Sequence, residues 1–346
     1  MERFDVLVVG GGPAGATCAY ELSGGGLRVL LVDIKRRIGT PVQCAEFVPV
    51  QLAHQFKAFF PQEAVVQRVK NMLHFTPWGQ TVSMWSEGYM LDREVFDYHI
   101  AELSRQRGAK VLLRTRFLGF EGDIVWLERL DRRETFPVKV DLVVGADGPR
   151  SRVARLTGKG TENFLTTAQV TLPLVERLED LLVYFREYIP GGYGWLFPKG
   201  QVANVGVGVD PYFSVNVVES LKRLVGELVA EGLVENKVLK RTGGWIPAEG
   251  LLKLVRGRVV LVGDAGGFCH PITGGGIANA VLSGHMAGRA ILEGRPQDLE
   301  EEAQDLFGDS LRRAAEKRKK YMKRWDNLRE IIPKTWIAFE EYWRTD

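Results

Sequence analysis

The chain has 346 residues, of which 45% are hydrophobic and 26% charged, with a formal net charge of +3. This composition is ordinary for a folded globular protein, and so small a charge gives no reason to expect a nucleic-acid partner. The length predicts one large domain or two closely associated ones. The apolar runs are far too short to cross a membrane, and the first residues lead directly into a strand pattern without a signal peptide.

The cysteines are few and widely spaced. Cys18, Cys44 and Cys269 form neither a disulfide framework nor the ligand spacing of a zinc site, so we expect no bound metal. Three unpaired thiols suit a reducing compartment. The sequence therefore predicts a cytoplasmic protein.

The N-terminal segment carries a strand–helix–strand pattern. Residues 4–10 (FDVLVVG) form a short apolar run that predicts a buried parallel strand. Residues 13–22 predict a helix that ends at the glycines 24–26, and residues 27–33 predict a second buried strand. Together these segments predict a β-α-β unit of the expected length.

A glycine-rich turn joins the first strand to the first helix. Gly10, Gly12 and Gly15 match G-x-G-x-x-G, in which glycines allow a tight turn and the close approach of a pyrophosphate to the helix N-terminus. Asp33 ends the second strand, where a carboxylate accepts hydrogen bonds from ribose hydroxyls. The motif is weak alone, but its position between strand and helix makes a nucleotide site the expected interpretation.

The middle of the chain first continues this pattern. Residues 34–60 lack periodicity and predict a loop with a short helix, and residues 91–108 predict an amphipathic helix. Residues 109–117 predict a strand, residues 118–140 a polar meander, and residues 140–148 a buried strand that ends in a turn.

The second half changes character and then returns to the first pattern. Residues 161–243 contain alternating apolar and polar runs, with a helix near 216–231, and predict an antiparallel sheet. Residues 258–267 predict another buried strand, residues 274–292 a helix entered through glycines, and the segment from residue 298 a charged helical tail. We therefore expect a second domain inserted into the first.

Two more aspartates follow buried strands. Asp147 lies in GADGPRS and Asp264 in VGDAGG, at the strand ends where ligands bind in open α/β sheets. Together with the glycine motif, they make the sequence resemble the FAD-dependent superfamily of group-A aromatic hydroxylases, in which three such motifs occur in this order. The resemblance covers most of residues 1–295.

The resemblance implies an α/β fold with a Rossmann-like FAD-binding domain, an inserted antiparallel-sheet (α+β) substrate domain and a C-terminal helical tail. It also implies that Asp33 holds the adenosine ribose, Asp264 the ribityl chain, and that Arg93 lies beside the flavin. The expected ranges are 1–65, 91–160 and 244–297 for the FAD-binding domain, 66–90 and 161–243 for the substrate domain, and 298–346 for the tail. The expected FAD-binding residues are Gly10, Gly12, Pro13, Ala14, Gly15, Asp33, Ile34, Cys44, Arg93, Asp147, Gly263, Asp264, Pro271, Gly274, Gly275, Gly276 and Ile277.

Two stretches point to one branch of this superfamily. Residues 193–199 read Y-x-W-x-F-P-K, and residues 41–46 (PVQCAE) place a glutamate two residues after a cysteine. Both resemble the geranylgeranyl reductase family. On a strand, Tyr193, Trp195 and Phe197 would point to one face, as the wall of a substrate pocket or, alternatively, as ordinary core.

The resemblance implies an FAD-dependent reductase that saturates carbon–carbon double bonds of an isoprenoid, with NAD(P)H or reduced ferredoxin as electron donor. Cys44 and Glu46 are the candidate catalytic residues, for proton delivery beside the flavin. The alternative is that they are a small buried thiol and a structural carboxylate. His270 has a weaker claim to a place near the flavin.

Two other functions remain open on the sequence. A monooxygenase of the same fold would act on an aromatic or polyketide substrate, and an electron-transfer flavoprotein would have a protein partner. The tail has a basic helix at 311–325, followed by Trp336, Phe339 and Trp343 at helical spacing. This tail would rest peripherally on an anionic membrane or, the interpretation we favour, dock its aromatic residues on the protein itself.

Overall fold

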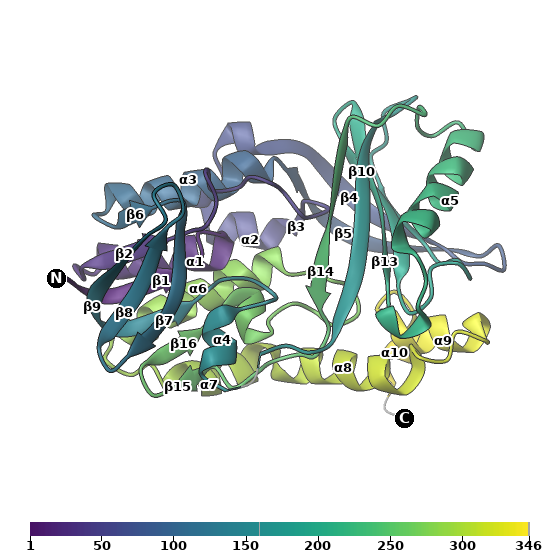
Figure 1. The fold of residues 1–346 in the computed structure, drawn as a ribbon. Coiled ribbons are helices and arrows are strands. Elements are labelled where there is room, and N and C mark those ends of the chain that lie inside the picture. The colour runs from purple at the N-terminus through teal and green to yellow at the C-terminus, as the bar shows by residue number, and fades with distance from the viewer. Residues whose placement is uncertain (159, 345–346) are drawn as a thin grey trace.

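The computed structural model describes residues 1–158 and 160–344 and contains two eight-stranded sheets, each with helices beside it (Figure 1). In the first sheet, β1 (Glu2–Val9) pairs in parallel with β2 (Val29–Val32) and β9 (Glu134–Gly145). The remaining strands of this sheet are β6 (Lys110–Leu112), β7 (Thr115–Glu121), β8 (Ile124–Arg129), β15 (Val255–Arg256) and β16 (Val259–Leu261).

The two faces of the first sheet are covered differently. Alternate β1 residues point to opposite faces, so Val8 packs in one core and Leu7 in another. The Val8 face packs against three helices, and the Leu7 face packs against the meander of β7 and β8 and against α4 (Arg152–Leu156). The three helices are α1 (Pro13–Gly24), α3 (Arg93–Gln106) and α6 (Ile277–Leu292).

The second sheet is mostly antiparallel, and its outer face is covered by α5 (Val217–Ala230). Leu196 points toward α5, whereas its neighbours Trp195 and Phe197 point to the inner face. In spatial order the strands are β14 (Lys240–Pro247), β10 (Phe164–Pro173), β13 (Val202–Val209), β12 (Tyr193–Lys199), β11 (Leu181–Tyr184), β4 (Val65–Phe75), β5 (Thr81–Leu91) and β3 (Phe47–Pro49).

The C-terminal segment is helical, as predicted, and it lies under the sheets in Figure 1. The chain reaches it after the short elements of the middle region. The C-terminal elements are α7 (Asp298–Ala303), the π-helical turn η5 (Gln304–Gly308), α8 (Asp309–Tyr321), α9 (Leu328–Thr335) and α10 (Glu340–Trp343). The short elements are α2 (Val50–Gln55) and the 3₁₀ turns η1 (Lys57–Phe59), η2 (Gln62–Ala64), η3 (Pro211–Phe213) and η4 (Gly263–Gly266).

The predicted fold class is confirmed, but two of the expected domain ranges do not follow the second sheet. The boundary at residues 243 and 244 cuts β14, which pairs with β10 along its whole length. β3 pairs with β5 in the second sheet, although it falls inside the range 1–65. The alternation of apolar and polar residues could not predict that β3 belongs to the second sheet, because the sheet to which a short strand belongs is set by its long-range partner, here β5. We propose a boundary beyond Pro247 instead.

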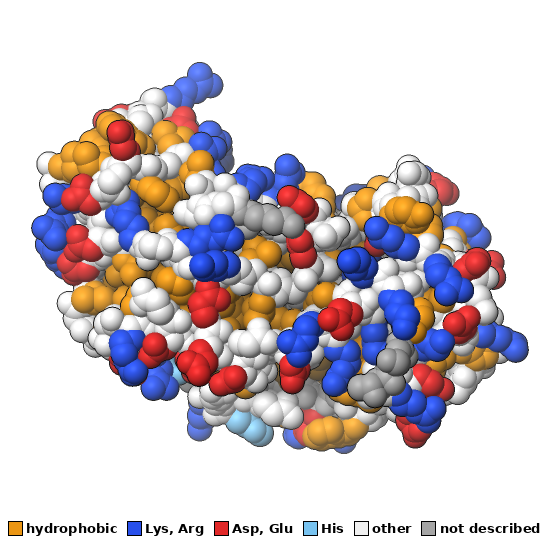
Figure 2. Space-filling view, turned by 90° about the horizontal axis from the view of Figure 1, so that it is seen from below, with side chains coloured by type: hydrophobic (Ala, Val, Ile, Leu, Met, Phe, Trp, Pro, Cys, Tyr) orange, Lys and Arg blue, Asp and Glu red, His pale blue; other side chains and the backbone are white. Residues whose placement is uncertain are grey.

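The aromatic residues of the tail dock mainly on the protein itself. Trp336 is 2% exposed and Phe339 is 8% exposed, and both pack with the inner face of the second sheet. Trp343 is 57% exposed. Figure 2 shows the underside, where Lys and Arg side chains are interspersed with Asp and Glu. Among the described helices, none is both long enough and apolar enough to span a bilayer.

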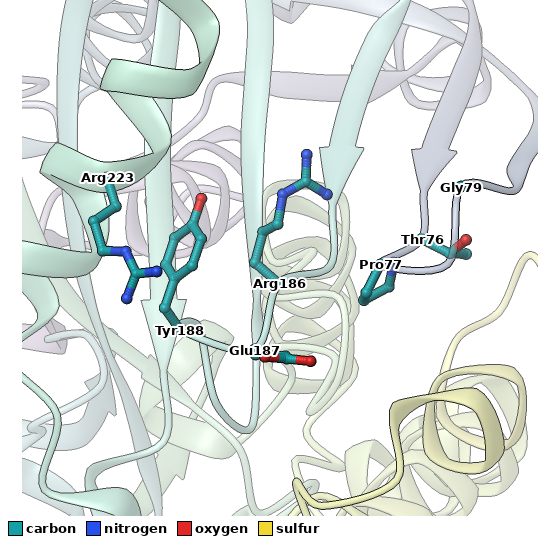
Figure 3. A pocket seen from close by; sticks show the side chains of 7 residues that line it. All are labelled: Thr76, Pro77, Gly79, Arg186, Glu187, Tyr188 and Arg223. Atoms are coloured by element: carbon teal, nitrogen blue, oxygen red, sulfur yellow. The ribbon is translucent and has the colours of Figure 1, made fainter.

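A hollow of about 620 Å³ opens at the end of the second sheet, on the side of α5 (Figure 3). Its charges are largely matched by Glu227, which accepts from Arg186 at 2.8 Å and from the Tyr188 hydroxyl at 2.7 Å. Arg223 lies over the Tyr188 ring, 4.2 Å from its centroid. None of the expected site residues lines this hollow, so we do not assign it to the active site.

A buried ion pair joins α8 to the end of β13. Arg318 Nη2 lies 2.7 Å from Asp210 Oδ2, and the two side chains are 8% and 15% exposed. Removing one member of such a pair leaves a buried charge without a partner. We expect Asp210→Ala to lower the free energy of unfolding by about 3 kcal/mol, measured by denaturant titration.

The matched control is Lys222→Met, which breaks the exposed pair of Lys222 with Glu219. We expect that change to stay within about 0.5 kcal/mol, because exposed ion pairs contribute little. Equal losses in the two variants would show that the buried pair does not fasten α8.

Candidate active site

The turn between β1 and α1 requires glycine at two of its three motif positions. Gly10 has a φ of +106°, and a Cβ there would lie 2.2 Å from the carbonyl oxygen of Ala146. A Cβ on Gly15 would lie 1.9 Å from the carbonyl oxygen of Gly10. A Cβ on Gly12, by contrast, would meet nothing within 4 Å, and no side chain caps the helix that Gly12 begins. This leaves open space at a helix N-terminus, which suits a pyrophosphate.

Asp33 ends β2 directly below this turn. It is 8% exposed, and its Oδ2 accepts a hydrogen bond from the Gly11 amide at 2.7 Å. Its Oδ1 accepts from the Lys35 amide at 2.8 Å. The carboxylate therefore lies at the turn, where the sequence placed it, and the adjacent Ile34 is 60% exposed.

The loops before α6 and α1 meet at this edge of the first sheet. Gly263 has a φ of +57°, and a Cβ on it would lie 2.8 Å from the Ala14 Cβ. A Cβ on Gly276 would lie 3.4 Å from both Asp264 Oδ1 and Cys269 Sγ. The remaining expected residues follow at the starts of the two helices: Pro13 in α1, and Pro271, Gly274, Gly275 and Ile277 before and at the start of α6.

Asp264 and Arg93 provide the charge of the site. Burial raises the pKa of Asp264 to about 6, and the positive charge of Arg93 opposes that rise. Arg93 begins α3 and forms two hydrogen bonds of 2.7 Å with Asp97, one turn later in the helix. The Asp97 carboxylate thus fixes the orientation of the Arg93 guanidinium. Asp97 was not identified from the sequence, although its position four residues after Arg93 on a helix indicates an ion pair.

Two expected candidates have mainly structural contacts. Asp147 accepts from the Ser151 hydroxyl at 2.5 Å and from the Arg152 amide at 2.6 Å, so it caps the start of α4. The imidazole of His270 accepts from the Thr273 amide at 3.2 Å. Burial lowers the pKa of His270 to about 4, so this ring is neutral at pH 7 and shapes the loop before Gly274.

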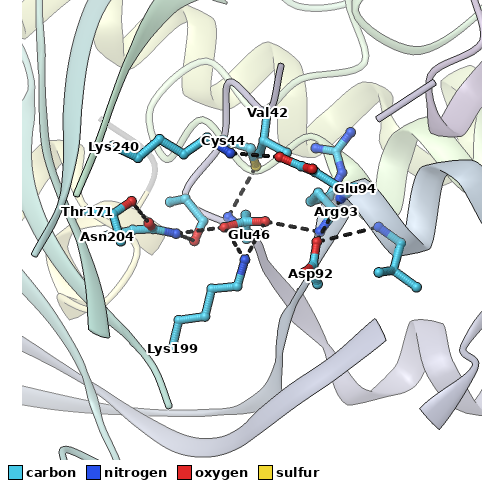
Figure 4. Close-up of polar contacts among 12 residues, drawn as sticks. Val42, Cys44, Glu46, Asp92, Arg93, Glu94, Thr171, Lys199, Asn204 and Lys240 are labelled. Carbon is cyan, nitrogen blue, oxygen red and sulfur yellow. Dashed lines mark hydrogen bonds and ion pairs between the residues drawn. The ribbon is translucent and has the colours of Figure 1, made fainter. Parts of the chain in front are cut away.

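The Cys44 loop, residues 42–46, lies between α3 and the second sheet (Figure 4). Cys44 Sγ accepts a hydrogen bond from the Glu46 amide at 3.2 Å. Glu46 has a φ of +75°, a left-handed conformation that is strained for a residue with a side chain. Burial raises the pKa of the Cys44 thiol, and Arg93 partly opposes this. The thiol is therefore protonated at pH 7.

The Glu46 carboxylate is surrounded by donors. Lys199 Nζ lies 2.8 Å from Oε2, Asn204 Nδ2 lies 2.9 Å from the same oxygen, and the Arg93 amide lies 3.0 Å from Oε1. Glu46 is 4% exposed. These contacts make the Glu46 carboxyl an acceptor that holds the loop. The sequence analysis assigned no role to Lys199 or Asn204, although Lys199 ends the Y-x-W-x-F-P-K stretch.

Tyr193, Trp195 and Phe197, together called the aromatic wall, line the inner face of the second sheet. All three are 5–8% exposed. The Tyr193 hydroxyl donates to the carbonyl oxygen of Thr273, directly before Gly274. Trp336 packs edge-on against Tyr193, with ring centroids 4.7 Å apart. The aromatic wall thus faces the loop before α6 on one side and the C-terminal helices on another.

The three sequence motifs therefore converge on one edge of the first sheet, opposite the aromatic wall. Residues 1–158 and 160–344 contain no group of three or more His, Cys, Asp or Glu side chains arranged to hold a metal ion. The open glycine turn, the Asp33 carboxylate and the buried Asp264 fit an adenine dinucleotide with a ribityl chain, which is FAD.

Comparison with known proteins gives the same class. A family model described as geranylgeranyl reductase catalytic domain matches residues 166–246, and a model described as NAD(P)-binding Rossmann-like domain matches residues 8–73. The chain is 35% identical to a digeranylgeranylglycerophospholipid reductase of Methanocella arvoryzae, over 84% of this chain and 78% of that protein. It is 31% identical to the protein of that description in Methanocaldococcus jannaschii, over 96% of this chain and 88% of that one.

Solved structures agree. A geranylgeranyl bacteriochlorophyll reductase-like protein of Thermoplasma acidophilum superposes with a TM-score of 0.86 at 27% identity, covering 95% of this chain and 90% of that one. Aklavinone-11 hydroxylase with FAD shares the fold, with a TM-score of 0.68 at 18% identity over 92% of this chain and 67% of that one. Fold and site together define an FAD-dependent oxidoreductase. Within that class, the chain belongs to the geranylgeranyl reductase family.

Asp264 makes a pH-dependent contribution to the stability of the FAD-free protein. Its pKa of about 6 in the folded state lies above its ordinary value of 3.8, so the neutral carboxyl favours folding. That contribution is complete below about pH 4 and is lost as the pH rises through 6. At pH 8 we expect FAD-free Asp264→Asn to melt about 2 °C or more above the FAD-free parent, measured by calorimetry.

Near pH 4 the two proteins should melt together. Melting temperatures that differ by the same amount at both pH values would contradict the assignment, because an uncharged side chain cannot lose a proton. The same variant should retain less FAD through gel filtration, since it loses the carboxylate expected at the ribityl chain.

Proposed function

We propose that this enzyme saturates carbon–carbon double bonds in the isoprenoid chains of a glycerophospholipid, with FAD as its cofactor. The observation that carries the proposal is the position of the aromatic wall beside the Cys44 loop, to which Gln169 links Trp195, and in contact with the loop before Gly274. The substrate class in the names of the relatives supports it. Reduced FAD, when bound, supplies the hydride for such a reaction.

The aromatic wall would hold the apolar chain. An isoprenoid chain has no carbonyl group to which a protein donor could hydrogen-bond, so its position in the site depends on burial against apolar surface. The faces of Tyr193 and Trp195 can also stabilise positive charge that develops on a carbon during proton addition. Trp336 extends the same surface from the C-terminal helices.

Cys44 is our candidate for the proton that the second carbon requires. Its thiol is protonated at pH 7, because burial raises its pKa. A thiol that gives its proton to carbon can recover one from water. Glu46 does not share this role, since its oxygens accept from Lys199 and Asn204. We propose instead that Glu46 fixes the Cys44 loop.

The alternative functions have no observation of their own. The monooxygenase and hydroxylase structures share the fold at 18% identity, and likeness at that level carries no substrate. For the electron donor, we propose NAD(P)H or reduced ferredoxin. The sequence has no second G-x-G-x-x-G after a strand, so NAD(P)H as the donor would bind transiently.

The test uses the FAD-loaded enzyme without oxygen. We expect photoreduced enzyme to be reoxidised by a digeranylgeranyl glycerophospholipid, with a gain of two hydrogens per double bond in the product by mass spectrometry. We expect Cys44→Ala to slow that reoxidation by about 100-fold or more, since a positioned general acid contributes about 10²–10⁴. The parent rate should also fall only at a pH above the ordinary thiol range, because the pKa of Cys44 is raised.

Cys18→Ala is the matched control, because Cys18 is a buried thiol within α1, away from the Cys44 loop. It should reoxidise at the parent rate. No reoxidation of the parent by any prenylated lipid, with turnover only when air and an aromatic substrate are supplied, would replace the reductase by the monooxygenase.

Contact with a membrane would bring the enzyme to such a lipid. We propose that the exposed basic residues after the middle of α8, among them Lys319, Lys323 and Arg324, lie against anionic headgroups. We expect co-sedimentation with phosphatidylglycerol vesicles that weakens at high salt, and a clear loss of binding in Lys319→Glu/Lys323→Glu. Equal binding to neutral phosphatidylcholine vesicles would contradict this surface.

A further inference from the structure

We propose that Gln169 is a positioning residue that links the aromatic wall to the Cys44 thiol. Its side chain hydrogen-bonds both to Trp195, on which the substrate would pack, and to the backbone of Cys44. The orientation of the Trp195 indole and the position of the Cys44 backbone are therefore coupled. The inference rests on the proposed function for the roles of Trp195 and Cys44. The contacts themselves are independent of it.

The link depends on a row of residues across three strands. Trp195 on β12 and Gln169 on β10 are both paired with Gly206 on β13, which lies between them. A Cβ on Gly206 would lie 2.2 Å from Trp195 Cζ2. The indole therefore lies flat across the glycine and reaches a strand that is not its neighbour. Any side chain at residue 206 would block this path.

The Gln169 amide has a partner at each end. Trp195 Nε1 donates to Gln169 Oε1 at 2.9 Å, and Gln169 Nε2 donates to the carbonyl oxygen of Cys44 at 3.0 Å. Gln169 is 5% exposed. An indole N–H can only donate and a carbonyl can only accept, so these partners fix the amide in one orientation. A flipped amide would lose both hydrogen bonds.

Other side chains of the sheet hold the same loop but do not touch the aromatic wall. The Thr242 hydroxyl donates to the carbonyl oxygen of Val42 at 2.9 Å, and Asn204 Nδ2 donates to that of Ala45 at 3.3 Å. These contacts fix the loop on the sheet. Gln169 alone among these three side chains also hydrogen-bonds a residue of the aromatic wall. It therefore adds an oriented polar connection to the apolar packing of Ala45 against the same wall.

The consequence follows from the cost of an unmade hydrogen bond. Replacing Gln169 with an apolar residue leaves the indole N–H and the Cys44 carbonyl without this partner, and buried polar groups without a partner are costly. The loop and the indole would relax to find other partners. The thiol would then move relative to the aromatic wall, although the fold of the sheet is unchanged.

The test measures the reactivity of the Cys44 thiol in the FAD-loaded enzyme. Iodoacetamide is the probe, and peptide mass spectrometry separates Cys44 from the buried Cys18 and Cys269. We expect Gln169→Met, which keeps the length but has no amide, to change the alkylation rate constant of Cys44 by about fivefold or more. Thr167→Val is the control: it lies on the same strand and loses one hydrogen bond, to Gly244, outside the Cys44 loop.

Trp195→Phe provides the second arm, because it keeps an aromatic ring but lacks the N–H. Its effect on Cys44 alkylation should not add to that of Gln169→Met in the double variant, since both remove one chain of contacts. If Gln169→Met does not fold, Gln169→Glu replaces it at pH 8, where a carboxylate still accepts from Trp195 but cannot donate to Cys44. A change below fivefold, a similar change in Thr167→Val, or additive effects would overturn the proposal.

The two proposals fail separately. If the parent enzyme reduces no prenylated lipid, the proposed function is wrong, while alkylation of Cys44 still decides whether Gln169 couples it to Trp195. If the parent is active but alkylation is unaffected, Gln169 is not a positioning residue and the reductase stands. An activity loss in Gln169→Met that shifts the pH profile of reduction toward that of Cys44→Ala would complete the case.

Discussion

The arrangement of the active site depends on the Glu46 carboxylate more than on any other group. It lies in a loop of the FAD-binding part and accepts from Lys199 and Asn204 of the second sheet and from the first amide of α3. It thus joins three elements that are distant in sequence. A left-handed φ of +75° at Glu46 persists because these partners over-determine it. The carboxylate acts together with the backbone contacts that Gln169, Thr242 and Asn204 make to the same loop, so Glu46 has a structural role in holding Cys44 in place.

The structure of the site also depends on how the aromatic wall packs against the loop before α6 and against the C-terminal helices. Tyr193 binds the carbonyl of Thr273 and so ties the second sheet to the loop that leads into α6. Trp336 covers the same ring from the opposite direction. A substrate chain packed against the aromatic wall would lie next to the loop before α6, the Cys44 loop and the C-terminal helices. If the proposed isoprenoid chain packs here, the surfaces around it rather than hydrogen bonds would set the position of a double bond.

The sequence predicted what is encoded locally. The glycine turn, Asp33, Asp264 and Arg93 could be located because each motif needs a fixed place after a strand or at a helix start, and the aromatic wall because alternation puts its residues on one face. The contacts of Gln169 and Asn204 could not, since they depend on strands pairing in a register that alternation does not reveal. For the same reason the expected boundary near residue 243 falls inside β14. The capping contacts of Asp147 were also hidden, because an aspartate after a buried strand looks the same whether it binds a ligand or the next helix.

The closure of the aromatic wall by Trp336 also has a consequence for how the protein is made. Tyr193 and Trp195 emerge from the ribosome well before α9, so the inner face of the second sheet is complete in strands while its cover is still missing. During that interval a broad aromatic surface faces water, and such surfaces promote association between nascent chains. The last helices thus act on the yield of folded protein as well as on the shape of the finished site, and a lesion in them would appear first as aggregation during synthesis.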